Sequence, residues 1–282
     1  MEKTFRSGFV AIVGRPNVGK STLINALVGE KVSIVSDKPN TTRNQVRGVM
    51  NREGVQVVLV DTPGIHKPKS ALGNRLNQSA NDAITDVDLV VVVVDGSVPM
   101  GPGDLRVLNQ VMPGAVVAVN KVDRTSKKEV FERLAALVPF DASSYFPISA
   151  KSGEGVDELA DFLFSKMEEG PAFYPESMKR DITDTEWIAE LVREALLKRV
   201  REEIPHSIAT MITEVEGRYI RCEIFVERDS QKAIVLGRGG VNVKEVGIEV
   251  RKHLPPNSYL DLVVKVAKDW QSRSSFLDDL GL

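Results

Sequence analysis

Short apolar runs alternate with amphipathic stretches along the first 170 residues. The runs are rich in β-branched residues and lie at 9–14, 56–61, 89–95, 115–121 and 145–149. Between them, apolar residues recur at helical spacing over 20–29, 74–84, 104–112, 128–138 and 156–167. Short continuous runs are typical of strands buried on both faces. Their alternation with helices predicts a mostly parallel sheet with helices on both faces.

The alternation stops near residue 170. Prolines, aromatic residues and mixed charge at 171–183 indicate a linker. Beyond it the pattern first predicts a helix over 185–204 that is closed by Pro205. Two antiparallel strands over 207–217 and 218–228, which turn near Gly217, are expected next. A glycine-rich loop at 237–240, a helix through His253, a strand over 258–269 and a terminal helix over 269–280 complete the prediction. The chain is therefore expected to hold an α/β domain over 1–170 and a separate α+β domain over 184–282.

Composition agrees with a soluble globular protein, since 42% of the residues are hydrophobic, 27% are charged and the net charge is −2. This balance excludes a protein surface that is basic overall and coats nucleic acid, but it allows a local basic patch. The single cysteine, Cys222, excludes an intramolecular disulfide, favours the cytoplasm and is best explained as a small buried apolar residue. The longest apolar run, 89–94, is far shorter than the roughly 20 residues of a membrane span. No signal-peptide layout precedes the first strand, so only peripheral membrane contact stays open.

The first chemical motif follows the first predicted strand. "GRPNVGKS" at 14–21 fits G-x-x-x-x-G-K-[ST] between a strand and a helix, the context that a phosphate-binding loop requires. Its glycines let backbone N–H groups surround phosphate oxygens, and the N-terminus of the helix adds positive potential. Lys20 is expected to reach the terminal phosphates, and the Ser21 hydroxyl is expected to ligate Mg²⁺.

Three further motifs each follow a predicted strand. In "NKVD" at 120–123, Asp123 can accept hydrogen bonds from the N1–H and 2-amino groups of guanine. Adenine does not offer these donors, so GTP is expected rather than ATP. "SAK" at 149–151 offers the Ala150 amide to guanine O6, while "DTPG" at 61–64 places Asp61 near Mg²⁺ and the Gly64 amide at the γ-phosphate. Motifs at the carboxyl ends of parallel strands converge on one ligand site.

Together with "TTR" at 41–43, these motifs resemble the Era-type branch of the translation-factor-like GTPases. The resemblance implies that Thr42 is the switch I ligand of Mg²⁺ that senses the γ-phosphate, whereas the residues alone rank Thr41 and Thr42 equally. It assigns catalysis to Asn17, Lys20, Thr42 and Gly64, and Mg²⁺ binding to Ser21, Thr42 and Asp61. The full set of expected guanine-nucleotide contacts is Gly14, Arg15, Pro16, Asn17, Val18, Gly19, Lys20, Ser21, Thr22, Asp61, Thr62, Pro63, Gly64, Asn120, Lys121, Asp123, Ser149, Ala150 and Lys151.

The residue after "DTPG" is Ile65, where Ras-like enzymes carry a glutamine that orients the attacking water. An apolar side chain cannot orient water, so slow intrinsic hydrolysis is expected. His66 is a candidate substitute, although a lone loop histidine is more often a solvated surface group. Relatives that share the asparagine of this loop, here Asn17, can use bound K⁺ where other enzymes use an arginine finger. K⁺ therefore joins GTP, GDP and Mg²⁺ as a candidate cofactor.

A second glycine-rich loop, Gly237-Arg238-Gly239-Gly240, precedes a predicted helix. It is not a dinucleotide fingerprint, because Asn242 stands where the third glycine is needed, and no Gly-Lys-Ser/Thr follows to make a second phosphate loop. A G-x-x-G loop has almost no side-chain bulk and can clamp the sugar–phosphate chain of single-stranded nucleic acid. The order helix, strand, strand, G-x-x-G, helix, strand resembles the type II KH domain as it occurs in Era-type proteins.

The charge pattern limits the extent of any RNA-binding face. Residues 182–282 carry 15 Lys/Arg against 17 Asp/Glu, whereas 231–252 carry five basic residues against two acidic ones. On charge alone, a solvated helix face with Glu–Lys/Arg pairs explains the run equally well, but the loop and the domain order favour RNA. Trp270 is expected to be a core anchor rather than a base-stacking platform. The predicted RNA contacts are Lys232, Gly237, Arg238, Gly239, Gly240 and Lys244.

The leading hypothesis is an Era-type GTPase that binds small-subunit ribosomal RNA near its 3′ end and assists assembly of the small ribosomal subunit. It is expected to be a monomer in the cytoplasm, with weak association at the inner face of the cell membrane left open. The alternative is a guanine-nucleotide-gated RNA-binding module with negligible turnover, because Ile65 and the lack of an evident arginine finger weaken the case for catalysis. An RNA-modification GTPase would need a further catalytic domain, and a tandem GTPase would need a second "GRPNVGKS".

Overall fold

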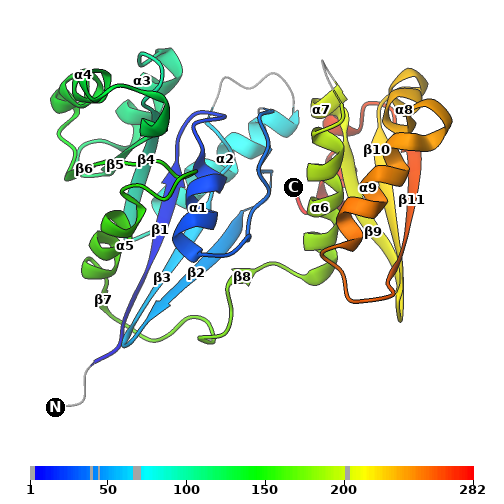
Figure 1. The fold of residues 1–282 in the computed structure, drawn as a ribbon, viewed down its shortest axis with the longest axis horizontal. Coiled ribbons are helices and arrows are strands. Elements are labelled where there is room, and N and C mark those ends of the chain that lie inside the picture. The colour runs from blue at the N-terminus through cyan, green and yellow to red at the C-terminus, as the bar shows by residue number, and fades with distance from the viewer. Residues whose placement is uncertain (1–3, 39–40, 44, 66–70, 201–203) are drawn as a thin grey trace. The chain divides into compact units, whose positions relative to one another are not determined.

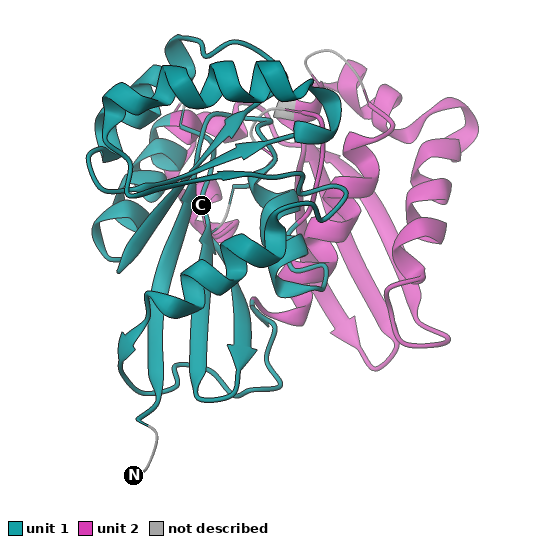
Figure 2. Cartoon of the chain, turned by 60° about the vertical axis from the view of Figure 1, so that its left-hand side comes forward, with its two compact units in different colours: residues 1–33, 42–68, 74–181 teal, residues 34–41, 69–73, 182–282 magenta. Residues whose placement is uncertain are grey.

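The computed structural model describes residues 4–38, 41–43, 45–65, 71–200 and 204–282 (Figure 1). The chain forms two compact units, shown in Figure 2. Unit 1 comprises residues 1–33, 42–68 and 74–181, and unit 2 comprises residues 34–41, 69–73 and 182–282. Among the described residues, no helix combines the length and the apolar character needed to cross a membrane.

Unit 1 is built on one sheet in which most neighbouring strands are parallel. Its strand order is β6-β5-β4-β1-β3-β2-β8, and β7 pairs with β1. β1 lies parallel to β3 and β4, and β4, β5 and β6 follow in parallel, whereas β2, β7 and β8 are antiparallel additions. The strands are β1 (Arg6–Val13), β2 (Val46–Arg52), β3 (Val55–Asp61), β4 (Leu89–Asp95), β5 (Val116–Asn120), β6 (Ser144–Pro147), β7 (Glu168–Glu169) and β8 (Arg180–Asp181).

Helices cover both faces of this sheet, as the alternating pattern predicts. α1 and α5 contribute to the core on one face, while α2, α3 and α4 contribute to the core on the other. The helices are α1 (Lys20–Val28), α2 (Ala71–Thr85), α3 (Pro102–Val111), α4 (Lys127–Leu137) and α5 (Val156–Ser165), with short 3₁₀ turns η1 (Val122–Arg124) and η2 (Val138–Phe140).

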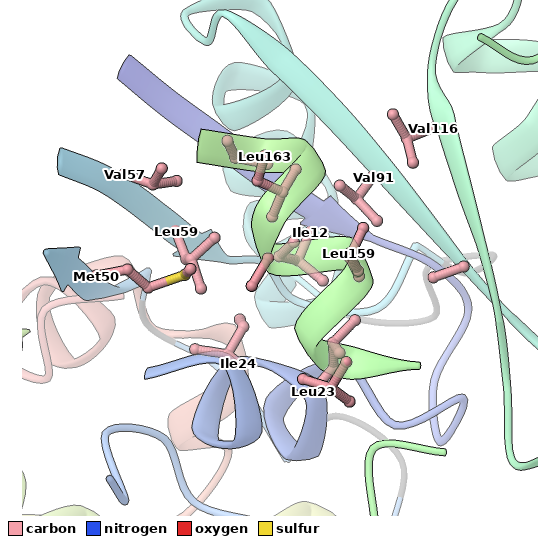
Figure 3. Close-up of a cluster of buried hydrophobic side chains, with 14 of the residues drawn as sticks. Ile12, Leu23, Ile24, Met50, Val57, Leu59, Val91, Val116, Leu159 and Leu163 are labelled. Atoms are coloured by element: carbon pink, nitrogen blue, oxygen red, sulfur yellow. The ribbon is translucent and has the colours of Figure 1, made fainter. Parts of the chain in front are cut away.

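Alternate residues of β1 build the two cores. Val10 and Ile12 join the cluster under α1 and α5, while Ala11 and Val13 join the opposite cluster. Figure 3 shows Ile12 among side chains from both covering helices. Complete burial of one such side chain is worth about 1.5–3 kcal/mol. These paired cores hold the strands rigidly and so fix the loops at their carboxyl ends.

The sequence pattern did not predict β2. This strand pairs antiparallel with β3 from Val46↔Asp61 to Arg52↔Val55. Its own sequence, "VRGVMNR", mixes charged residues with glycine, so β3 and the helix packing rather than local propensity determine its conformation. The predicted linker over 171–183 is also not a free tether, because Arg180–Asp181 pair with β2 as β8. Ser7 Oγ further donates to the Pro171 carbonyl at 2.6 Å.

Unit 2 is a three-stranded sheet with α6, α8 and α9 packed on one face, while Phe276 of α10 contacts Phe225 of β10, whose side chain points to the other face. Its strand order is β11-β10-β9, with β9 antiparallel and β11 parallel to β10. The core between sheet and helices includes Cys222 and Ile224 of β10, both fully buried. The elements are α6 (Asp184–Leu197), α7 (Ile204–Ser207), β9 (Ala209–Glu216), β10 (Tyr219–Val226), α8 (Asp229–Leu236), η3 (Arg238–Gly240), α9 (Val241–Arg251), β11 (Tyr259–Val266), η4 (Trp270–Ser272) and α10 (Ser274–Asp279).

Three expectations for unit 2 need correction. The helix expected over 185–204 ends at Leu197, and Pro205 lies at the start of a separate short helix, where a missing N–H is harmless. A helix, α8, lies between β10 and the glycine-rich loop, where none was expected. The terminal helix is shorter than 269–280 and is preceded by a 3₁₀ turn. Trp270 is fully buried and donates from Nε1 to the Ser207 carbonyl at 2.9 Å, which confirms its core role.

The segment before the "TTR" motif belongs to unit 2. Ile34 joins the core of this unit, and the Val35 amide donates to Glu194 of α6 at 3.0 Å. Buried Arg193 of α6 donates to the Thr41 carbonyl and is itself held by Glu190. In this segment, Ile34 therefore shares the core of unit 2, and Val35 and Thr41 share hydrogen bonds with its first helix.

Candidate functional site

The phosphate loop joins β1 to α1, and its close packing requires glycine at both ends. A Cβ on Gly14 would lie 2.6 Å from the Val93 carbonyl oxygen, and one on Gly19 would lie 2.3 Å from Nδ2 of Asn120. Asn17 has a left-handed φ of 66°, which asparagine tolerates better than most residues. The packing thus fixes the path of the loop, whose backbone amides are the groups expected to bind phosphate oxygens.

Lys20 begins α1 and lies under this loop. Its ammonium donates to the carbonyl oxygens of Gly14 at 3.2 Å and Arg15 at 3.3 Å. Burial lowers the pKa of Lys20 to about 8, and attraction from the Asp61 carboxylate opposes that shift. A phosphate group at the loop would supply the negative charge that this buried ammonium needs.

Ser21, Thr42 and Asp61 converge beside the loop, although 40 residues separate the first from the last. Ser21 Oγ lies 2.9 Å from Asp61 Oδ2 and 3.0 Å from Thr42 Oγ1, and Thr42 Oγ1 lies 3.2 Å from the same carboxylate oxygen. Asp61 is fully buried, and its Oδ1 has no hydrogen-bond partner among the described residues. Two hydroxyls and an orphaned carboxylate oxygen are hard oxygen donors of the kind that suits Mg²⁺.

Electrostatics support a cation at this point. Burial raises the pKa of Asp61, against the opposing effects of Ser33, Lys20, Ser21 and Thr42. A divalent cation would stabilise the ionised carboxylate in its buried surroundings. Within the described ranges, no group of three or more Asp, Glu, His or Cys residues forms a competing metal site.

Asn120, the last residue of β5, forms hydrogen bonds with three loops. Its Nδ2 donates to the Val18 carbonyl at 2.8 Å, and its Oδ1 accepts from the amides of Lys121 at 2.8 Å and Ala150 at 2.9 Å. Asp123 accepts from Ser149 Oγ at 2.7 Å. The structure therefore brings "NKVD", "SAK" and the phosphate loop together at one edge of the sheet.

The remaining predicted nucleotide contacts surround the same edge. A Cβ on Gly64 would lie 2.8 Å from the Pro16 nitrogen, so "DTPG" passes close to the phosphate loop. Thr62 is buried and donates to the Ile12 carbonyl at 2.8 Å, whereas Lys151 is exposed. Ile65 is buried in the core, with its amide directed to the Gly14 carbonyl at 3.3 Å. Thr22 lies in the first turn of α1, Pro63 follows Thr62, and His66 lies outside the described residues.

The motifs did not point to Ser33, which is nonetheless part of this site. Its hydroxyl donates to Asp61 Oδ2 at 2.6 Å, and the residue is only 2% exposed. Ser33 lies in the loop after α1, and no sequence spacing marks its position. Only the folded path of that loop reveals the contact.

The second glycine-rich loop lies between α8 and α9 in unit 2. Gly237, Gly239 and Gly240 have φ angles of 71°, 63° and 79°. A Cβ on Gly237 would lie 2.8 Å from Cγ of Asn242, whose Nδ2 donates to the Ile234 carbonyl at 2.9 Å. Nothing lies within 4 Å of a Cβ at Gly239 or Gly240, so these two glycines present open backbone.

Acidic residues of α9 are paired away from this loop. Glu249 accepts from Lys198 at 2.7 Å and from Arg199 at 2.8 Å, and Glu245 lies 3.3 Å from Arg199. Hydrogen bonds from Lys198 and Arg199 hold the pKa of Glu249 below its usual value. The predicted RNA contacts Arg238 and Lys244 are exposed, and Lys232 is half-buried.

Comparison with known proteins identifies the family. A model described as 50S ribosome-binding GTPase matches residues 9–121, and a KH domain model matches residues 203–271. GTPase Era of Mycolicibacterium smegmatis is 45% identical over 296 residues, an alignment that covers 98% of this chain and 99% of the relative. The chain belongs to the GTPase Era family. GTPase Era of Heliobacterium modesticaldum is 42% identical over 294 residues, covering 100% of this chain and 98% of the relative.

Two solved Era structures match both units of this Era-family chain. Each has a TM-score of 0.93 and 35% identity, covering 98% of this chain and 99% of the other. One is a single-residue variant of Aquifex aeolicus Era bound to GDP·AlF₄⁻. The other is Era in complex with MgGDPNP and nucleotides 1506–1542 of 16S ribosomal RNA. The comparisons confirm the expected fold class, an α/β P-loop GTPase domain with a mostly parallel sheet followed by an α+β type II KH domain.

Proposed function

We propose that this GTPase switches between GTP- and GDP-bound states at the site in unit 1 and binds small-subunit ribosomal RNA near its 3′ end through unit 2. In this role it would assist assembly of the small ribosomal subunit. One observation carries the proposal: the same chain holds the guanine-nucleotide motifs together at one edge of a sheet and presents open backbone in a G-x-x-G loop. The Era complex with MgGDPNP and 16S ribosomal RNA supports the choice of RNA.

In the proposed nucleotide complex, backbone amides of residues 14–21 surround the phosphates and Lys20 neutralises their charge. Ser21, Thr42 and Asp61 hold Mg²⁺, which would neutralise charge that develops on the phosphate oxygens. Thr42 and the Gly64 amide sense the γ-phosphate. Their proximity to the loop in the present geometry supports these roles.

Guanine selection falls to Asp123, supported by Ser149. The Ala150 amide, which donates to Asn120 Oδ1 in this structure, would turn to guanine O6 when the nucleotide binds. The hydrogen bonds of Asn120 keep these groups in place. Adenine would cover the Asp123 carboxylate without offering it hydrogen-bond donors, which would disfavour adenine by at least a few kcal/mol.

Hydrolysis is proposed to be slow in the isolated chain. Ile65 is buried and apolar, so it cannot orient the attacking water. Membership of a GTPase family, together with the GDP·AlF₄⁻ complex of Aquifex aeolicus Era, favours hydrolysis over a module with negligible turnover. Single-turnover hydrolysis with and without ribosomal RNA would distinguish the two.

We extend the proposal to K⁺, bound by Asn17, as an activator of hydrolysis. Exchange of Na⁺ for K⁺ is expected to raise the single-turnover rate at least about tenfold, because the cation would stabilise charge developing in the transition state. Because Asn17 has φ 66°, Asn17→Gly removes the side chain without backbone strain and should abolish the effect, as should Asn17→Ala. Equal rates in K⁺ and Na⁺ buffers would exclude this role.

The RNA face proposed for unit 2 combines open backbone, positive charge and apolar surface. Gly239 and Gly240 would approach the sugar–phosphate chain, with Arg238, Lys232 and Lys244 adding charge. Ile234, Val241 and Ile248 of the flanking helices are 49%, 43% and 45% exposed and offer an apolar surface to bases. Pairing of Glu245 and Glu249 with Lys198 and Arg199 reduces repulsion of phosphate.

Coupling between the two activities is proposed to run through the segment before Thr42. Val35 and Thr41 are hydrogen-bonded to Glu194 and Arg193 of α6 within unit 2, and Thr41 is joined directly to Thr42. A change in Thr42 on loss of the γ-phosphate would therefore be transmitted along the chain to α6.

We propose that the protein acts as a monomer in the cytoplasm, with weak peripheral association at the inner face of the membrane. Support for the latter is the surface of α4, where Phe131 and Val138 just beyond its end are 73% and 65% exposed and Lys127 and Lys128 are nearby in sequence. Flotation with anionic vesicles, compared with a Phe131→Ser variant, tests this; equal absence of binding would exclude it.

Crosslinking of the GTP-bound protein to cellular RNA tests the RNA assignment. Gly239→Asp places a carboxylate at the open loop and should abolish crosslinking, because it repels phosphate. Gly217→Asp is the matched control, since Gly217 has a similar φ of 58°, is equally open and lies in the β9–β10 turn. Equal crosslinking by both variants would overturn the assignment of RNA binding to this loop.

A further inference from the structure

Asp95 is a nearly buried carboxylate outside the four nucleotide motifs. It ends β4 and pairs in register with Asn120 of β5, and its side chain is 9% exposed. Its Oδ1 accepts from the Ser97 amide at 3.0 Å and from the Ser97 hydroxyl at 2.5 Å. Its Oδ2 accepts from Lys121 Nζ at 2.6 Å. One oxygen is thus engaged by the local turn, and the other receives the ammonium of the "NKVD" lysine.

Lys121 spans two loops of the nucleotide site. Its backbone is left-handed, with φ 70°, and its amide is held by Asn120 Oδ1 at 2.8 Å. Its ammonium donates to the carbonyl oxygen of Asn17 at 2.8 Å as well as to Asp95. The side chain therefore connects the guanine-recognition loop to the phosphate loop, and Asp95 binds its ammonium group.

We propose that Asp95 is a positioning residue for guanine-nucleotide retention, which acts by holding the Lys121 ammonium against the phosphate loop. Lysine is a flexible side chain with a compact charge, so a fixed carboxylate is needed to keep it in one geometry. With Asp95 in place, the two loops on either side of the nucleotide are fastened to one another. Without it, the ammonium retains only a neutral carbonyl acceptor and the loops separate more easily.

Surrounding groups favour the ionised form of Asp95. Burial acts to raise the pKa of this carboxyl, but hydrogen bonds from Lys121 and Ser97 outweigh it and keep the pKa below its ordinary value. Arg15 of the phosphate loop contributes further positive charge, with a guanidinium nitrogen 3.9 Å from Asp95 Oδ2. The same guanidinium donates from Nε to the buried carboxylate of Asp104 at 2.8 Å, so its own orientation is fixed.

This inference rests on the proposed placement of Lys121 at the guanine nucleotide. A double-mutant cycle on the full chain tests it, with release of a fluorescent GDP analogue followed by stopped flow for Asp95→Asn, Lys121→Met and the double variant. Each single variant is expected to release GDP about tenfold faster, the scale of a lost charged hydrogen bond. The double variant should match Lys121→Met, because Asp95 acts through that residue. Turnover at saturating GTP should stay within about twofold of the parent for Asp95→Asn, since the carboxylate does not touch the reacting phosphate.

The outcomes separate this inference from the proposed site. If Lys121→Met leaves release unchanged, the assignment of Lys121 to the nucleotide site fails. If Lys121→Met accelerates release but Asp95→Asn does not, or if the two effects multiply, Asp95 is not a positioning residue although the site stands. Asp161→Asn, an exposed carboxylate paired with Arg52 in the same unit, is the control and should release GDP at the parent rate. If Asp95→Asn fails to fold, Ser97→Ala takes its place, because it removes the hydroxyl that donates to the same carboxylate. This variant should accelerate GDP release to a smaller extent, and an unchanged rate would overturn the proposal.

Discussion

At the scale of single residues, base selection depends on the Asp123 carboxylate. Asp123→Asn is expected to lower GTP affinity at least about 100-fold and to create affinity for XTP, because xanthine carries an acceptor where guanine carries its 2-amino donor. Competition against a fluorescent nucleotide measures both affinities. Asp279→Asn, an exposed acid in α10, is the control. An unchanged preference for GTP in Asp123→Asn would place guanine recognition elsewhere.

Cys222 provides a residue-scale test of the second core. Burial raises the pKa of this thiol from 9.0 to about 12. At pH 8.5 the native protein is therefore expected to hold well under about a thousandth of it as thiolate and to resist a disulfide reagent, whereas the urea-unfolded chain should react quickly. The native state retains the proton more tightly than the unfolded state, so this thiol lowers stability as pH rises from about 9 to 12. Rapid labelling of the native chain at pH 8.5 would contradict the buried position.

At the scale of elements, two glycines of the G-x-x-G loop, Gly237 and Gly239, are expected to tolerate a methyl group differently. Gly239→Ala meets only the left-handed backbone cost of about 1–2 kcal/mol, because no atom lies within 4 Å. Gly237→Ala costs more for two reasons: the φ of 71° and ψ of 172° at Gly237 lie in a region that is almost exclusive to glycine, and a Cβ would displace Asn242, whose hydrogen bond to Ile234 is worth about 1 kcal/mol. Urea unfolding of both variants should give the lower stability to Gly237→Ala. Equal losses would mean that neither the backbone conformation of Gly237 nor its contact with Asn242 restricts this position.

Elements differed in how well local sequence predicted them. The buried strands of unit 1 were predicted because β-branched runs such as 89–95 match a sheet covered on both faces. β2 was missed because Arg47, Gly48 and Asn51 interrupt its apolar residues, and its pairing with β3 determines its conformation. α8 was missed because "DSQKAIVL" contains β-branched residues. Its place is set by Val235 in the core and by Gly237, where the helix ends.

The candidate site shows the same division between local and long-range information. Contiguous motifs located Lys20, Asp61 and Asp123, since their chemistry depends on a short loop after a strand. Ser33 and Asp95 were not predicted, because their partners lie 28 and 26 residues away and only the fold brings them together.

At the scale of the whole molecule, the central feature is that one chain carries a nucleotide site and an RNA face with a covalent route between them. Ile34 shares the core of unit 2, while Thr42 shares a hydrogen bond with Asp61 in unit 1. Nucleotide can control RNA binding only if RNA has different affinities for the GTP-bound and the GDP-bound protein. Reciprocity then requires RNA to change the affinity for GTP relative to GDP by the same factor.

The most direct test is equilibrium binding of an RNA spanning the 3′ end of the small-subunit ribosomal RNA to the full chain, with GDP and with a non-hydrolysable GTP analogue. The two affinities are expected to differ at least about fivefold, as for a typical coupling free energy. Gly239→Asp should bind poorly in both states, and Gly217→Asp should retain both the affinities and their ratio. Equal affinity of the parent chain for RNA in the two nucleotide states would contradict the account of a nucleotide-controlled RNA-binding switch.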